Sequence, residues 1–308
     1  MALSNIQAPQ AVVMIRPHHF KVNPETAADN AFQQDSAEMD QTELARSAFK
    51  ELSVAAKRLE DAGIRVHIFE DESTETPDSV FPNNWFSTHS GGHVALYPMY
   101  SEARRKERRS DVVDMLKNQY RVQDVIDYSG LEQDGIFLEG TGAMVLDHID
   151  RIAYAVKSNR TDPIVLERFC THFNYEPMVF EAEDDNGVAI YHTNVLMCIA
   201  TSFVLICLDM IKDPKRRDEM IKRFEYSGRE VIDITQSQIA DFAGNAIELH
   251  NGEKSILALS SRASSALTAA QVSIIKKSST LLELDIPSIE LAGGSVRCTL
   301  AGVHLTPR

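Results

Sequence analysis

Apolar and polar residues follow one another along this chain in a recurring order of short strands and single helices. The segments 11–15 and 64–69 have the pattern of strands, and apolar residues at helical spacing fill the segment 37–62 between them. The apolar positions of this helix are Leu44, Ala48, Leu52, Ala55, Ala56 and Leu59. Gly63 follows, where a helix C-cap belongs. The first unit is therefore a strand, a helix and a strand.

The remaining elements repeat this order with one more strand at the start of each unit. Helices are predicted at 101–119, 163–172 and 214–226, and from about residue 268 onwards. Strands are predicted at 93–97, 122–126, 144–146, 152–156, 177–180, 189–197, 203–207, 230–234, 246–250, 255–259 and 281–289, and the segments 81–86 and 136–140 open the second and third units. The chain is therefore predicted to be an α/β protein of five ββαβ units.

Polar residues that follow apolar strands recur at a nearly fixed interval. Successive residues of the series Asn84, Glu139, His192, Asn245 and Cys298 are 55, 53, 53 and 53 positions apart. A fixed period favours a repeat architecture, closed on itself or stacked. A ring of five units would bring these polar side chains to one central site. Chance remains the alternative, because βαβ units often have about this length.

Composition narrows the class of protein. The chain has 308 residues, 44% of them hydrophobic, and a net charge of −14, which argues against nucleic acid and anionic membranes as partners. There is no evident signal peptide, and the apolar run 195–211 is too short and too interrupted to span a bilayer. The four cysteines have no zinc-binding spacing, and so few thiols indicate a reducing compartment. We expect a cytoplasmic protein of one domain, 1–308, and a homodimer is allowed.

The most informative cysteine is Cys298. It follows Gly293 and Gly294, which permit a tight turn or a close approach, and it stands next to Arg297. A cysteine beside a cation can be held as a thiolate, which is the nucleophilic form. The alternative is a small buried apolar residue, which is the commoner fate of a free cysteine.

Four short motifs resemble those of the guanidine-modifying superfamily of arginine deiminases, dimethylarginine hydrolases, agmatine deiminases and amidinotransferases. They are 137–142 (Phe-Leu-Glu-Gly-Thr-Gly), 158–161 (Ser-Asn-Arg-Thr), 191–194 (Tyr-His-Thr-Asn) and 293–298 (Gly-Gly-Ser-Val-Arg-Cys). The resemblance covers nearly the whole chain and implies a five-bladed α/β propeller, or pentein, with pseudo-fivefold symmetry. It also implies a nucleophilic cysteine, a histidine and an acidic residue, which would be Cys298, His192 and Glu139 here. It assigns the substrate carboxylate to Arg160.

Two departures from the family pattern bear on the substrate. The family usually has aspartates where this chain has Asn84 and Asn194, and those carboxylates grip a cationic guanidinium. An amide is neutral and both donates and accepts, which suits a ureido group such as that of citrulline. The sequence also resembles most closely a citrulline hydrolase-like subgroup of the superfamily, which agrees with the amide argument but does not follow from it. Asn84 has a simpler alternative role in shaping the turn at 82–84.

The residues predict hydrolysis through a covalent intermediate on Cys298, with His192 moving protons and Glu139 orienting it. Arg104 and Arg105 are further candidates for the substrate carboxylate, although a solvated helix face would explain them equally well. No metal or nucleotide cofactor is implied, since no P-loop or complete dinucleotide fingerprint is present. The expected partner is a small amino acid. Two alternatives remain open: an arginine or dimethylarginine hydrolase, deiminase or amidinotransferase, and a propeller that only binds a ligand.

Overall fold

Five three-stranded sheets organise the part of the chain that the computed structural model describes, which is residues 7–26, 30–34, 36 and 38–308. In each sheet the middle strand pairs antiparallel with one neighbour and parallel with the other. The same arrangement holds in the last two sheets. The protein is therefore a mixed α/β fold in which one local topology occurs five times.

The strands follow chain order except in the first sheet. That sheet contains β15 (Ala301–Val303), β1 (Ala11–Pro17) and β2 (Arg65–Asp71). The second contains β3 (Phe86–His89), β4 (His93–Leu96) and β5 (Asp124–Asp127). The third contains β6 (Met144–Asp147), β7 (Ile152–Val156) and β8 (Glu176–Phe180). The fourth contains β9 (Met197–Ile199), β10 (Phe203–Ile206) and β11 (Glu230–Asp233), and the fifth β12 (Ile247–His250), β13 (Ser255–Ser260) and β14 (Ser279–Leu284).

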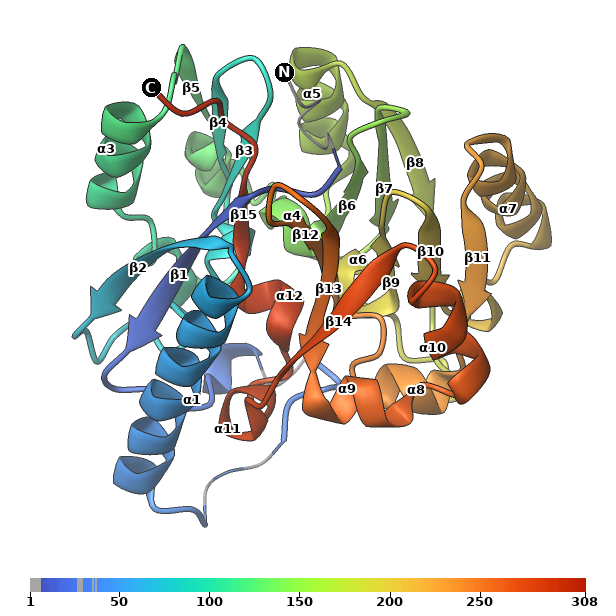
Figure 1. Cartoon of the computed structure of the whole chain (residues 1–308). Helices are drawn as coiled ribbons and strands as arrows, with labels where there is room; N and C mark the ends of the chain where they lie inside the picture. Colours follow the sequence, from blue (N-terminus) through green and yellow to red (C-terminus); the bar gives the residue numbers. More distant parts are fainter. Residues whose placement is uncertain (1–6, 27–29, 35, 37) are drawn as a thin grey trace.

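Figure 1 shows the longer helices at the outside of the molecule and several one-turn helices near its middle. The longer ones are α1 (Gln41–Asp61), α3 (Ser110–Gln119), α5 (Pro163–Phe173), α7 (Pro214–Tyr226) and α10 (Ala269–Ile275). The central ones include α4 (Gly140–Ala143), α6 (Thr193–Leu196) and α12 (Val296–Thr299). Further short helices are α2 (Glu102–Arg105), α8 (Gln236–Ala240), α9 (Ser261–Ala266) and α11 (Pro287–Glu290), with 3-10 turns η1 (Pro24–Thr26), η2 (Pro82–Asn84), η3 (Ser129–Asp134) and η4 (Leu208–Met210). Within the described residues, no helix combines the length and the apolar character needed to cross a bilayer.

The first long helix, α1, confirms the core-facing positions predicted from the apolar periodicity. All six apolar positions predicted to face the core are buried in α1, from Leu44 to Leu59. Asp40 caps the first turn by accepting from the backbone N–H of Thr42 and Glu43. Gly63 adopts a positive φ of 88° just past the last turn, as predicted for a helix end. The helix boundary is later than predicted, and residue 37 lies outside the described residues.

The first sheet joins the two ends of the chain. Strand β1 pairs in parallel with β2 and antiparallel with β15, with Val12 opposite Gly302. The sequence pattern left the first unit without its opening strand. The structure supplies that strand from the C-terminal segment just after Cys298.

One predicted strand near the site is wrong. Of the segment 189–197, only Met197 belongs to a strand, since α6 occupies Thr193–Leu196. Thr193 fixes this turn, because its hydroxyl donates to Ala143 O at 2.6 Å and accepts from Val156 N at 2.8 Å. Asn194 therefore lies in a helical turn and not in a strand.

Two more elements differ from the prediction because of contacts made in the folded protein. The predicted helix 101–119 is divided into α2 and α3, and the chain between them turns so that Arg104 and Glu107 are buried. The predicted strand 281–289 ends at Leu284, and α11 follows from Pro287. Glu51 of the distant helix α1 accepts from the N–H of Ser288 and caps α11.

Candidate active site

A narrow pocket lies where the short turns before the first strands of the sheets meet. Cys298, His192 and Asn84 all line it, and they come from α12, the N-cap of α6 and η2. The pocket holds about 280 Å³ of empty space, including the part open to solvent. Its other lining residues are Thr26, Asn30, Asp78, Phe81, Arg104, Arg160, Tyr191, Ala292 and Gly294. Sulfur, imidazole and amide from three separate units therefore face one space.

The sulfur of Cys298 is surrounded by amide donors. Asn194 Nδ2 donates to Cys298 Sγ over 3.3 Å, and Asn245 Nδ2 donates to it over 3.2 Å. Cys298 is buried, and the Oδ1 atoms of both amides are buried with no hydrogen-bond partner in the described part of the chain. Two N–H groups aimed at one sulfur stabilise negative charge there. The same donors could stabilise an oxyanion that forms next to the sulfur.

His192 and Glu139 form a buried pair. His192 Nε2 lies 2.8 Å from Glu139 Oε2, so Nε2 carries the proton and Nδ1 is left as the acceptor nitrogen. Burial lowers the pKa of His192 to about 4, against the hydrogen bond and charge of Glu139 that raise it. Burial raises the pKa of Glu139, but Arg160 and His192 outweigh it and hold that pKa well below the usual range. At neutral pH the pair is a neutral imidazole and a carboxylate.

Two buried arginines surround the same carboxylate. Arg160 Nη1 lies 3.3 Å from Glu139 Oε2, and Arg104 Nη1 lies 3.7 Å from it. Arg160 also stacks over the ring of Tyr191 at 4.9 Å. Glu107 holds Arg104 with two hydrogen bonds of 3.0 Å. The negative charge of Glu139 is therefore matched by fixed cations that also line the pocket.

Asn84 reaches this cluster because Gly142 has no side chain. A Cβ on Gly142 would lie 2.2 Å from Asn84 Oδ1 and 2.9 Å from the ring of His192. With its amide oxygen turned to Arg104, Asn84 accepts from Nη1 at 2.8 Å and donates to Asn83 Oδ1 at 3.1 Å. The Gly-Thr-Gly motif thus makes room for two of the predicted site residues to approach one another.

One predicted substrate-binding residue lies elsewhere. Arg105 donates to the backbone oxygen of Met99 at 3.1 Å, is partly exposed, and does not line the pocket. Its neighbour Arg104 is buried and does line the pocket, so a solvated helix face does not describe Arg104. The difference arises because the chain turns inward between α2 and α3, which a single-helix reading could not show.

Sequence reasoning missed one charged group of the site, Asp78, and included one amide, Asn245, only through the interval series. Asp78 is buried, lines the pocket, accepts from Asn23 Nδ2 at 2.7 Å and lies 3.8 Å from Arg104 Nε. No repeat or motif singled it out, because it lies in an irregular polar segment. Asn245 does not line the pocket but binds the sulfur from beneath it. Its place in the interval series was the one available signal.

The interval series joins positions that are not all equivalent. Glu139 and His192 are both N-caps of one-turn helices. Cys298, however, lies inside α12, and its counterpart in α6 is Asn194, since each precedes the next strand by three residues. Asn245 follows a loop and belongs to no helix. The side chains converge because each turn precedes an inner strand, and the constant spacing from His192 onwards is partly coincidence.

The chain is similar to known proteins both in its sequence family and in its fold. A family model described as "N,N dimethylarginine dimethylhydrolase, eukaryotic" matches residues 16–305. A search of curated protein sequences finds no match. The family match spans both the Glu139 and the Cys298 motifs.

Solved structures of similar fold cover almost the whole chain. The substrate-bound N-terminal domain of a mutant of ArgZ, an arginine dihydrolase from the ornithine–ammonia cycle in Cyanobacteria, gives a TM-score of 0.74 at 17% identity, over 95% of this chain and 97% of that one. AgrE in complex with ornithine and NAD+ gives a TM-score of 0.76 at 18% identity, and the match covers 97% of this chain and 40% of that one. A mutant DDAH from Pseudomonas aeruginosa complexed with citrulline gives a TM-score of 0.63 at 13% identity, and the match covers 96% of this chain and 99% of that one. At these identities the likeness establishes a shared fold.

Proposed function

Since the chain belongs to the N,N-dimethylarginine dimethylhydrolase family within the guanidine-modifying superfamily, we propose that it is a cysteine-dependent hydrolase that converts citrulline to ornithine, ammonia and carbon dioxide. One observation carries the choice of substrate. The side chains that donate hydrogen bonds to Cys298 Sγ are two neutral amides, while the buried carboxylates Glu139 and Asp78 lie against arginines. Among the described residues, no carboxylate bonds to the sulfur, so a cationic guanidinium would meet amides there, whereas a neutral ureido group would find donors and acceptors.

The first half of the reaction makes a covalent intermediate. Neutral His192 takes the thiol proton of Cys298 at Nδ1, and Glu139 stabilises the resulting imidazolium through Nε2. The thiolate attacks the ureido carbon, and the amide N–H groups of Asn194 and Asn245 stabilise the charge on the ureido oxygen. His192 returns its proton to the departing nitrogen, which leaves as ammonia. The product on the enzyme is an S-carbamoyl adduct that still carries the ornithine side chain.

The second half of the reaction hydrolyses the S-carbamoyl adduct. His192 takes a proton from water, hydroxide attacks the carbamoyl carbon, and the C–S bond breaks to return the thiolate, which His192 reprotonates. The released carbamate loses carbon dioxide and gives the free amine. One water is consumed for each ammonia and carbon dioxide formed.

We assign the amino-acid end of the substrate to the charged side chains that line the pocket. Arg160 and Arg104 supply cations for the carboxylate, and Asp78 supplies an anion for the ammonium group. Asn30, which also lines the pocket, donates to Ala292 O at 3.0 Å and so ties its loop to the turn before Cys298.

We also propose that the five sheets form one propeller domain around the site. Strand β15 closes the first sheet, and a turn that carries a site residue precedes β3, β6, β9 and β15. This arrangement explains how residues 84 and 298 meet in one pocket.

The test measures ammonia or methylamine release from citrulline, arginine and dimethylarginine with the purified protein. We expect citrulline to have the highest kcat/KM. Cys298→Ala should lower turnover at least ~10³-fold, because the nucleophile is lost. Cys170→Ala is the matched control, since Cys170 is also buried but lies in the helix-covered core away from the pocket.

A further variant tests the amide argument. Asn194→Asp should lower kcat/KM for citrulline by ~10²-fold or more, because a donor to the oxyanion becomes a carboxylate that repels it. Faster turnover of arginine or dimethylarginine by the native chain would overturn the choice of citrulline and favour the activity that the family description names. Ligand binding with no turnover of any of the three, in both native chain and Cys298→Ala, would favour a binding protein.

A further inference from the structure

A second cavity lies behind the catalytic pocket, on the other side of the layer of short turns. It is lined by the inner strands of all five sheets, and it shares no lining residue with the first pocket. It contains about 620 Å³ of empty space, including its open mouth. Helix α12 divides the two spaces, since Cys298 lines one and its neighbour Arg297 lines the other. Successive helical residues point about 100° apart, so one turn serves both cavities.

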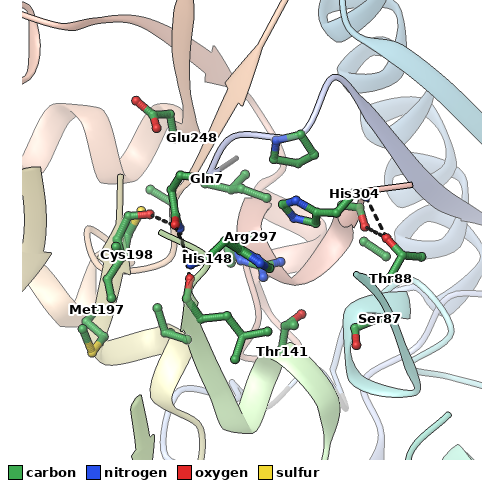
Figure 2. A pocket seen from close by; sticks show the side chains of 18 of the residues that line it. Gln7, Ser87, Thr88, Thr141, His148, Met197, Cys198, Glu248, Arg297 and His304 are labelled. Atoms are coloured by element: carbon green, nitrogen blue, oxygen red, sulfur yellow. Dashed lines mark hydrogen bonds between the residues drawn. The ribbon is translucent and has the colours of Figure 1, made fainter. Parts of the chain in front are cut away.

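Arg297 is the principal charge in this second cavity. Figure 2 shows its side chain near the centre of the cavity, whereas the carboxylate of Glu248 lies at the edge. Within the described residues, the guanidinium makes one hydrogen bond, from Nη1 to Leu300 O at 3.0 Å, and no ion pair with a carboxylate. Arg297 is half-buried, and burial lowers its pKa. A cation that is partly removed from water without a counter-charge loses hydration, so the site favours an anion.

The carboxylate of Glu248 also lines this cavity, but it does not act as the counter-ion of Arg297 because its oxygens accept other hydrogen bonds. Glu248 Oε2 accepts from the N–H of Thr201 at 2.7 Å and from its hydroxyl at 2.6 Å. Glu248 Oε1 accepts from Ser279 Oγ at 3.0 Å. These bonds hold the carboxylate against its own sheet and the preceding one, away from Arg297.

His148 supplies a second donor to the same cavity. Arg151 Nη1 donates to Tyr175 OH at 3.0 Å, so the hydroxyl proton points to His148 Nδ1, 2.8 Å away. Burial and the neighbouring His304 hold the pKa of His148 well below its usual value, so the ring is neutral and its proton is on Nε2. In the described part of the chain this N–H has no hydrogen-bond partner.

We propose that this cavity is a binding site for a small inorganic anion, held by the guanidinium of Arg297 and the ring N–H of His148. A guanidinium binds halides and planar or tetrahedral oxyanions, and a neutral imidazole adds one directed donor. The net charge of −14 does not prevent this, because charges beyond about 10 Å are screened at 0.1 M salt. Bicarbonate, phosphate and chloride share the chemistry that the site recognises.

The probe for this site is bromide. Crystals grown without chloride and soaked in sodium bromide should show anomalous density beside Arg297. Arg297→Met should remove that density, Arg297→Lys should keep it at lower occupancy, and Arg308→Met, which removes an exposed cation, should leave it unchanged. Bromide found only on exposed lysines and arginines, or unchanged in Arg297→Met, would overturn the proposal.

Two further arms identify the source of the anion and separate this proposal from the catalytic one. Soaks that add excess bicarbonate or excess phosphate to the bromide should displace it if either is the preferred ligand, and retention against both assigns the site to halide. Cys298→Ser should keep the bromide, because the anion and not a thiolate neutralises Arg297. Loss of bromide in Cys298→Ser would contradict the proposal, whereas the activity of the native chain towards citrulline has no bearing on it.

Discussion

At the scale of single residues, the absence of a side chain at Gly142 is as informative as any group that the site contains. The methyl group that alanine would add lies less than 3 Å from both Asn84 and His192. Gly140 is similarly confined, with a positive φ of 46° and a Cβ position 2.5 Å from Asn83 O. Two glycines in one turn thus let three units of the chain approach one another.

Protonation of His192 makes stability depend on pH. Its folded pKa of about 4 lies below the usual value of 6.5, so the unfolded chain binds more protons between these pH values. Stability from this residue is complete above pH 6.5 and is lost as pH falls towards 4, by roughly 3 kcal/mol at most. Glu139, whose pKa is lowered, adds a further loss at still lower pH.

We therefore predict that the free energy of unfolding falls steeply between pH 6.5 and 4.5, and that His192→Gln makes this fall shallower. Urea unfolding at several pH values measures it. His19→Gln, at an exposed position, is the control and should keep the native slope. An equal slope in His192→Gln and the native chain would show that burial does not depress this pKa.

At the scale of elements, ion pairs between neighbouring sheets contribute more than those on the surface. Arg229, just before β11, is buried and binds Asp147 at the end of β6 through Nη1 at 2.7 Å and Nη2 at 2.8 Å. Its Nε donates to Ala200 O at 2.9 Å. This group therefore links the third sheet to the fourth.

Removing Arg229 should lower the free energy of unfolding far more than removing an exposed arginine that is also paired with a carboxylate. Arg229→Ala leaves Asp147 buried without its cation and should cost about 3–5 kcal/mol of unfolding free energy. Arg223→Ala breaks an exposed pair with Glu176 and should cost about 1 kcal/mol or less. Chemical denaturation of the two variants compares them directly, and similar losses would refute the linking role of Arg229.

At the scale of the whole molecule, the last strand fixes the position of Cys298, the proposed nucleophile. Val303 of β15 is buried opposite Ala11 of β1, and β15 begins three residues after Cys298. The pairing of the two chain ends therefore holds α12 against the other turns of the site.

A charge placed in that pairing should disrupt both stability and the site. Val303→Asp buries an unpaired carboxylate and should cost about 3 kcal/mol or more, with loss of citrulline turnover at temperatures where the native chain is active. Thr306→Asp, at an exposed position three residues later, should be close to native in both. Thermal unfolding and ammonia release measure the two effects, and a native-like Val303→Asp would show that the site does not depend on this closure.

The repetition of ββαβ units, the buried face of α1 and the bounds of α7 could be predicted from the sequence, because each follows from local periodicity and capping. The candidate chemistry could be named for the same reason, as Cys298, His192 and Glu139 stand in recognisable motifs, and the family match agrees with that resemblance. The assignment of 189–197 to a strand failed because Thr193 bonds to two other elements and forces a turn.

What the sequence by itself determined is the number and order of the units and the residue types that carry chemistry. Only the tertiary structure decided that β15 completes the first sheet, that Arg104 faces the pocket and Arg105 does not, that Asp78 lines the pocket, and that Asn245 bonds to the sulfur of Cys298. The physical reason is that local patterns report on neighbours along the chain. Pairing of distant strands and burial of a charge depend on partners that approach only when the sheets assemble.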